Sequence, residues 1–88
     1  MQTLVIYDIE SDRVRYKVAE ACKDYGLERI QYSAFWGEIS NNRREELIYR
    51  LRHTLGRKVG NIIIFAICDR DLKLKKELRN QGDYSTPN

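Results

Sequence analysis

The chain has 88 residues, of which 42% are hydrophobic and 33% are charged. This length leaves room for one small domain, and the apolar share excludes disorder over most of the chain. The longest apolar run, residues 62–68, is far shorter than the roughly 20 residues that cross a bilayer, and no signal peptide is visible at the start. We therefore expect a soluble, cytoplasmic protein without membrane contacts.

The net charge indicates the class of binding partner, and the cysteine spacing indicates whether to expect a disulfide or a zinc site. Sixteen Lys and Arg residues against 13 Asp and Glu residues give a net charge of +3, which favours polyanionic partners. Cys22 and Cys68 show no CxxC spacing and no nearby pair of histidines. We expect them to be small buried hydrophobic residues, and neither a disulfide nor a zinc site.

The first half of the chain predicts a strand, a helix and a long β segment. The β-branched run over residues 4–9 indicates a buried strand. Ser11 is placed to cap a helix over residues 12–25, and Gly26 stands where a left-handed C-cap belongs. From residue 28 to residue 39 the hydrophobic period changes to two, and Gly37 is placed to divide this long segment into a strand pair.

The second half adds a helix and a strand. The helix begins at Ser40 or Asn41 and ends near residue 55, before a glycine. A strand is expected over residues 61–68, followed by a short helical segment over residues 69–79 and a loose tail over residues 80–88. We find no internal linker, so residues 1–88 form one domain with a core over about residues 3–68.

This order predicts an α+β fold of the ferredoxin-like βαββαβ type, an antiparallel sheet with both helices on one face. The last strand is apolar on both of its sides: Ile62, Ile64 and Ala66 alternate with Ile63, Phe65 and Ile67. Helices on one face can cover only one of these sets. We therefore expect a homodimer through the open face of the sheet, although the pattern leaves open which set faces the partner.

Asp8 is the first candidate functional residue. A carboxylate at the end of an apolar strand loses solvation unless it is paired or holds a cation. It is either a ligand of Mg²⁺, which takes one or two carboxylates plus waters and phosphate oxygens, or a cap or ion-pair residue at the turn into the first helix.

Basic side chains crowd the two predicted helices. They either follow a phosphate backbone, which binds arginine and lysine without sequence preference, or form a solvated surface. The candidates are Arg13, Arg15, Lys17, Arg43, Arg44, Arg50, Arg52, Arg57 and Lys58.

The aromatic residues of the strands also have two possible roles. Tyr7, Tyr32, Phe35 and Trp36 either stack on bases or pack in the core or a dimer contact. The only histidine, His53, has no cysteine or second histidine to work with, so we expect a surface residue. The sequence contains no P-loop, GxGxxG or GxSxG motif, which leaves nucleotide hydrolysis, dinucleotide chemistry and acyl transfer without support.

Two motifs together resemble the small CRISPR-associated adaptation protein family, whose members have been described as CRISPR-associated endoribonucleases. They are residues 5–9, VIYDI, and residues 25–38, YGLERIQYSAFWGE. The similarity extends over residues 3–68. It implies a ferredoxin-like homodimer that partners the CRISPR integrase in acquiring new spacers. It also implies metal-dependent cleavage of nucleic acid, either single-stranded RNA or double-stranded DNA.

The resemblance also implies roles for single residues. Asp8 matches the metal-binding aspartate, which would hold Mg²⁺ with one carboxylate from each subunit. Arg15 and Arg29 match basic residues implicated in activity, and Phe35 matches an aromatic residue near the same site. Lys17 stands where arginine is common, which keeps the charge but loses the bidentate fork. The same fold occurs in virulence-associated protein D toxins, so a toxin that cleaves messenger RNA is the alternative, as is an adaptor without catalysis.

Overall fold

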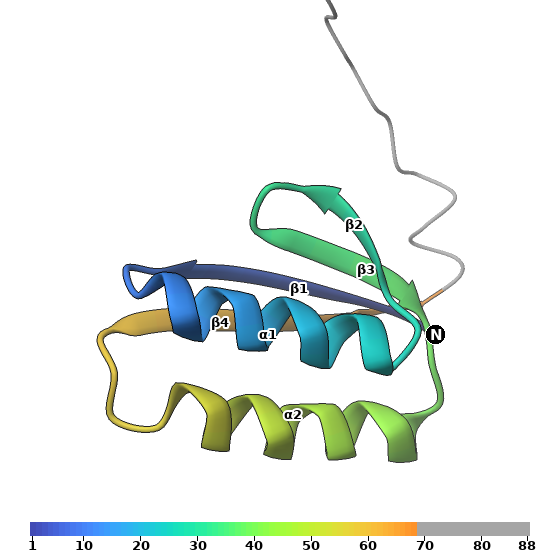
Figure 1. The fold of residues 1–88 in the computed structure, drawn as a ribbon. Helices are drawn as coiled ribbons and strands as arrows, with labels where there is room; N and C mark the ends of the chain where they lie inside the picture. Colours follow the sequence, from blue (N-terminus) through green and yellow to red (C-terminus); the bar gives the residue numbers. More distant parts are fainter. Residues whose placement is uncertain (69–88) are drawn as a thin grey trace, which may run out of the picture.

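The computed structural model describes residues 1–68, so the helical segment expected over residues 69–79 and the tail over residues 80–88 lie outside the described residues. The described elements follow the order that the sequence predicts (Figure 1). They are β1 (Gln2–Ile9), α1 (Asp12–Asp24), β2 (Glu28–Gln31), β3 (Ala34–Glu38), α2 (Asn41–Leu55) and β4 (Gly60–Ile67).

The four strands form one antiparallel sheet in the order β2-β3-β1-β4. Both helices lie on the same side of this sheet (Figure 1). The predicted ferredoxin-like fold is therefore confirmed. In the described residues, no helix combines the length and the apolar character needed to cross a membrane.

The ends of α1 are set by its flanking residues, as predicted. The Ser11 hydroxyl accepts a hydrogen bond from the Val14 amide at 3.2 Å, which satisfies one of the free donors at the helix start. At the other end Gly26 has φ +87°. The Leu27 amide donates to the Cys22 carbonyl at 3.0 Å and the Gly26 amide to the Lys23 carbonyl at 2.9 Å. This is the Schellman motif, and it turns the chain directly into β2.

The division of the long β segment was predicted at the wrong place. The turn between β2 and β3 falls at Tyr32 and Ser33, whereas Gly37 lies inside β3 opposite Thr3. A Cβ atom on Gly37 would come within 3.0 Å of the Leu27 side chain, so the glycine is needed for close packing. The irregularity in the ladder lies between Arg29 and Gln31 of β2.

The sheet has one buried face and one open face. On β1, alternate residues are buried against the helices, namely Thr3, Val5, Tyr7 and Ile9. The register assigns to the opposite face a set of apolar residues from three strands: Leu4, Ile6, Ala34, Trp36, Ile63, Phe65 and Ile67. We call these residues the open-face patch.

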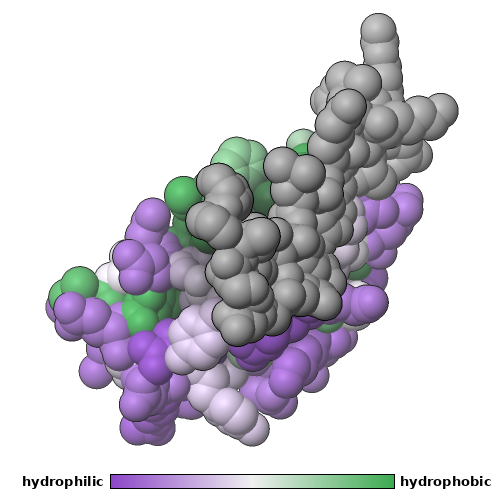
Figure 2. Space-filling view, turned by 90° about the horizontal axis from the view of Figure 1, so that it is seen from above, coloured by the Kyte–Doolittle hydropathy of each residue, from purple (hydrophilic) through white to green (hydrophobic). Residues whose placement is uncertain are grey.

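Three large members of the open-face patch are exposed to solvent, whereas Leu4, Trp36 and Ile67 are half-buried and Ala34 is buried. The exposed fraction is 38% for Ile6, 42% for Ile63 and 46% for Phe65. In contrast, Ile62 and Ile64 pack against the buried core. Seen from above in Figure 2, hydrophobic residues reach the surface beside hydrophilic ones. The side of β4 that faces away from the helices is therefore the one with Ile63, Phe65 and Ile67.

The two cysteines differ in burial, so the prediction of two buried residues holds only for Cys22. Cys22 is fully buried under the sheet, whereas Cys68 is half-buried. Burial raises the pKa of the Cys22 thiol to about 12. This thiol therefore behaves as a small hydrophobic group of the core.

Candidate nucleic-acid site

Asp8 lies at the end of β1 on the open face of the sheet. Its neighbour across the ladder is Asn61 of β4, and its side chain is exposed. The two residues line a shallow pocket of about 290 Å³ together with Glu10, Val59 and Gly60. Asp8 thus lies beyond Ile6, at the edge of the open-face patch.

A single chain offers few ligands for a metal ion at Asp8. The part of the chain that the structure describes contains no group of three or more His, Cys, Asp or Glu side chains that could hold an ion. Mg²⁺ needs only one or two carboxylates, because waters and substrate phosphates complete its shell. The donors present at Asp8 therefore fit Mg²⁺ shared with a phosphate, or with a second copy of Asp8.

Arg15 is fixed at the junction of β1 and α1. Its Nη1 donates to the Ile9 carbonyl at 3.0 Å and to the Glu10 carbonyl at 3.1 Å. Its Nη2 forms an ion pair with Asp12. These contacts aim the guanidinium toward the helix side of the sheet.

Arg29 is positioned by the hairpin that carries it. Its Nη1 donates to the Tyr32 carbonyl at 2.6 Å, and its guanidinium lies 4.9 Å from the centre of the Phe35 ring. Phe35 itself is fully buried and stacks on Tyr7 at 6.3 Å. Because no part of Phe35 reaches solvent, it can support Arg29 but cannot touch a substrate in this conformation.

Arg15 and Arg29 meet in a pocket between α1 and the β2–β3 hairpin, which we call the α1–hairpin pocket. Its volume is about 210 Å³, and its lining residues are Tyr7, Asp12, Arg15, Tyr16, Ala19, Glu20, Lys23, Arg29 and Tyr32. Burial raises the pKa of Tyr7, and the nearby Arg29 opposes this effect. The hydroxyl of Tyr7 therefore stays protonated near neutral pH.

The structure does not gather all the predicted site residues in one place. Asp8 and Tyr7 are neighbours in a strand, so their side chains point to opposite faces of the sheet. Asp8 therefore lies on the open face, while Arg15, Arg29 and Phe35 lie on the helix side. The role of Tyr7 beside the arginines was missed, although strict alternation around Asp8 was a signal for it.

The basic residues of the helices fall into two groups. Some have partners within the protein: Arg50 forms an ion pair with Asp24 at 2.9 Å, and Arg43 lies 4.6 Å from the centre of the Tyr25 ring. Arg44 donates to the Asn41 side chain at 2.6 Å. These contacts tie α2 to α1 or to itself.

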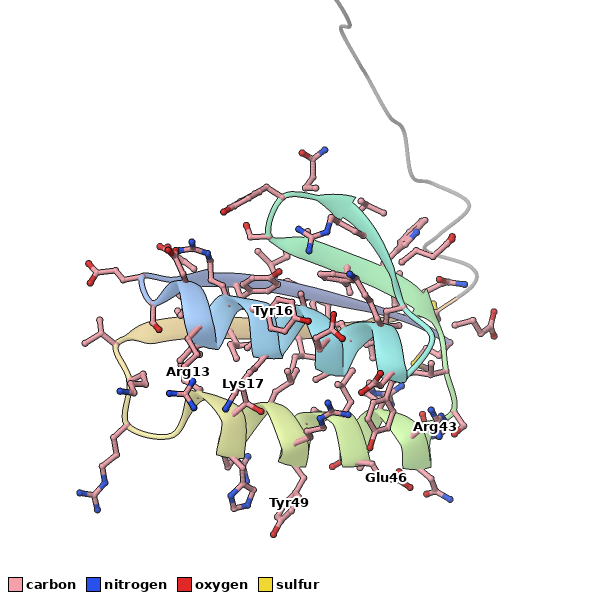
Figure 3. The ribbon with its side chains drawn as sticks, viewed as in Figure 1. Arg13, Tyr16, Lys17, Arg43, Glu46 and Tyr49 are labelled. Carbon is pink, nitrogen blue, oxygen red and sulfur yellow. The ribbon has the colours of Figure 1, made fainter. Side chains whose placement is uncertain are left out.

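Other basic residues are exposed and form no ion pair within residues 1–68. They are Arg13 and Lys17 of α1, Arg52 of α2, and Arg57 and Lys58 in the loop before β4. Figure 3 shows Arg13 and Lys17 projecting from α1 on the side of α2. As predicted, His53 is exposed, and its ring lies edge-on to Tyr49 at 4.3 Å.

Comparisons with known proteins agree with this architecture. The family model described as CRISPR associated protein Cas2 matches residues 1–80. The chain belongs to the Cas2 family. A CRISPR-associated endoribonuclease Cas2 from Desulforudis audaxviator is 56% identical over 78 residues, which are 89% of this chain and 74% of the relative.

Two further comparisons extend the family match. A Cas1/Cas2 endonuclease fusion from Thermoproteus tenax is 38% identical over 72 residues, which are 82% of this chain and 27% of the fusion. The crystal structure of Streptococcus pyogenes Cas2 superposes with a TM-score of 0.75 at 24% identity and covers 90% of this chain and 100% of that one. The resemblance seen in the two sequence motifs is thus confirmed at the level of family and fold.

Proposed function

We propose that this chain acts as a homodimeric CRISPR adaptation protein that binds nucleic acid and cleaves it as a Mg²⁺-dependent endonuclease. The single observation that carries the proposal is the position of Asp8, an exposed carboxylate at the edge of an apolar sheet face. Two comparisons support it: one relative is named an endoribonuclease, and another is a fusion of Cas1 with Cas2. The fusion supports the CRISPR integrase as the partner.

The proposed dimer forms through the open-face patch. Contact between two such faces removes exposed side chains such as Ile6, Ile63 and Phe65 from water, which is favourable by roughly 25 cal/mol per Å² of apolar area. A two-fold contact is self-complementary, so each chain brings its Asp8 to the same interface. The family resemblance implies that the two-fold axis passes close to Asp8, and in that arrangement the two carboxylates lie side by side.

Asp8 from each subunit would hold the ion, with waters and a phosphate oxygen of the substrate completing its shell. When bound, Mg²⁺ supplies an attacking water of lowered pKa. Arg15 and Arg29 act from the helix side, where their fixed guanidinium groups bind the phosphates of the substrate strand. Phe35 positions Arg29 through the ring contact at 4.9 Å.

The substrate strand is RNA or DNA, and the exposed cations of both helices extend its binding surface. Because Arg13, Lys17, Arg52, Arg57 and Lys58 form no ion pair within residues 1–68, they are available to phosphates. Contacts of this kind are independent of sequence.

The test compares the parental protein with Asp8→Asn, which keeps the size of the side chain and removes its charge. We expect Asp8→Asn to lose divalent-dependent cleavage of single-stranded RNA and of duplex DNA by at least tenfold. The dimer should persist, and metal-free binding should hold or rise slightly, since a negative charge near the phosphates is gone.

Spacer acquisition with the integrase separates the enzyme from the adaptor. We expect Asp8→Asn to support acquisition at nearly the parental level. Equal cleavage by both proteins would assign the activity to another site or to a contaminant and would contradict the catalytic role. If neither protein cleaves while both support acquisition, the chain is an adaptor without catalysis.

A further inference from the structure

The α1–hairpin pocket carries features that binding of a duplex to the helices does not explain. Tyr16 projects from α1 and Tyr32 from the hairpin turn, and both line the pocket. Their exposed fractions are 67% and 72%. Two aromatic rings on facing walls that contribute so little to the core are available to a ligand.

The charges in the pocket favour an anionic ligand. Asp12 forms an ion pair with Arg15, and Glu20 forms one with Lys23 at 3.7 Å. The lining therefore holds three cations against two carboxylates, and Arg29 has no carboxylate partner among residues 1–68.

Arg29 is also held in place without being neutralised. One nitrogen of its fork donates to the Tyr32 carbonyl at 2.6 Å, and the ring of Phe35 supports its plane. The same hairpin turn therefore presents a fixed cation and an exposed aromatic ring side by side. Arg15 adds a second guanidinium, 5.9 Å from the centre of the Tyr32 ring.

A positively charged groove with exposed aromatic rings is the arrangement that binds single strands, since bases stack on the rings and phosphates bind the cations. A duplex cannot place a base in such a pocket, because its base faces are hidden within the stack. The volume of about 210 Å³ and the position between α1 and the hairpin suit one unit of a strand.

We propose that the α1–hairpin pocket binds one unpaired nucleotide of a single strand, with its base against Tyr32 and Tyr16 and its phosphate on Arg29 and Lys23. This inference rests on the proposed nucleic-acid-binding function and specifies the part of the substrate that one face recognises. The pocket lies on the helix side of the sheet, so a dimer through the open-face patch leaves it accessible, and Asp8 on the other face takes no part in it.

The experiment measures binding of fluorescent single-stranded oligo(dT) and oligo(rU), and of a duplex of the same length, by anisotropy without divalent ions. The variants are Tyr16→Ala and Tyr32→Ala, with Tyr16→Phe and Tyr32→Phe to keep the rings. Tyr49→Ala is the matched control, because Tyr49 is 63% exposed on α2 and lies outside the pocket. All three tyrosines are largely exposed, so the variants should fold.

We expect each Tyr→Ala change in the pocket to weaken single-strand binding by about tenfold, since the base loses a ring on which it stacks. Duplex binding should change less than twofold, and the Tyr→Phe variants and Tyr49→Ala should match the parent. Equal affinity in the pocket variants and in Tyr49→Ala, or an equal loss for duplex, would overturn the proposal for the pocket alone. A parent that binds neither probe would instead overturn the proposed function.

Discussion

At the scale of single residues, the alternation of side chains along β1 places neighbouring residues on opposite faces of the sheet, in different environments. Tyr7 and Asp8 are adjacent, yet Tyr7 is buried beside Arg29 while Asp8 is exposed on the opposite face. The sequence predicted Asp8 from its place at the end of an apolar strand. It could not place Arg29 relative to Asp8, because that depends on where the hairpin turns and which face each strand presents.

Cys22 gives a prediction at this scale. Burial raises the pKa of its thiol to about 12, against a usual value near 8.5–9 in an unfolded chain. Between these values the unfolded state loses a proton that the folded state keeps, so the free energy of unfolding should fall as pH rises. We expect a loss of about 1.4 kcal/mol between pH 8 and pH 10 from this thiol.

Urea unfolding of the parent and of Cys22→Ala at the two pH values measures this loss. The variant should be less stable at pH 8, because it leaves a cavity in the core. Its stability should then decline less steeply with pH than that of the parent, by about the same 1.4 kcal/mol. Parallel declines would show that the thiol titrates alike in both states.

At the scale of elements, the helices were easier to predict than the hairpin. Ser11, Gly26, Ser40 and Gly56 each act within one turn of chain, and the caps fall where the sequence predicts them. The turn at Tyr32 and Ser33 contains neither glycine nor proline. The division was predicted at Gly37 instead. This glycine allows close packing against Leu27, a tertiary contact that a local sequence pattern does not reveal.

The cations at the end of α2 and in the loop that follows it give a prediction at the scale of elements. Arg52, Arg57 and Lys58 are exposed and form no ion pair within residues 1–68, so replacing all three with glutamine should leave the fold intact. We expect weaker duplex binding at all sequences. The slope of log affinity against log salt should flatten by about 0.9 for each phosphate that the variant no longer neutralises.

Anisotropy titrations of a duplex at several salt concentrations measure this slope. Glu45→Gln on the same helix is the control of opposite sign, since it removes an exposed negative charge and should raise affinity slightly. An unchanged slope in the triple variant would show that these residues form a solvated surface and do not contact phosphates. A loss of affinity that depends on sequence would indicate binding to bases.

At the scale of the whole molecule, the sheet separates a face covered by helices from an apolar face that no described element covers. The apolar strands predicted a second apolar face, and the register identifies its members, from Ile6 of β1 to Phe65 of β4. The sequence could not say which side of β4 is covered, because that depends on where the helices pack. With Ile62 and Ile64 against the core, no described element covers the other side, which is the face proposed above for the dimer contact.

The last prediction tests this arrangement. Phe65 is 46% exposed in the open-face patch, so Phe65→Glu would bury two charges in a dimer contact at little cost to the monomer. The parent should sediment at about twice 10.5 kDa at micromolar concentration, and Phe65→Glu as a monomer. Tyr49→Glu, at a position 63% exposed on α2 and therefore on the helix side of the sheet, should remain dimeric.

Phe65→Glu also separates the proposed functions of the two faces of the sheet. A monomer loses the second Asp8 and should therefore lose divalent-dependent cleavage, whereas the α1–hairpin pocket lies within one chain and should keep its affinity for a single strand. Cleavage retained by a monomer would contradict the shared carboxylate site. A parent that sediments as a monomer would contradict the open-face contact itself, because its exposed apolar side chains would then have no partner of this kind.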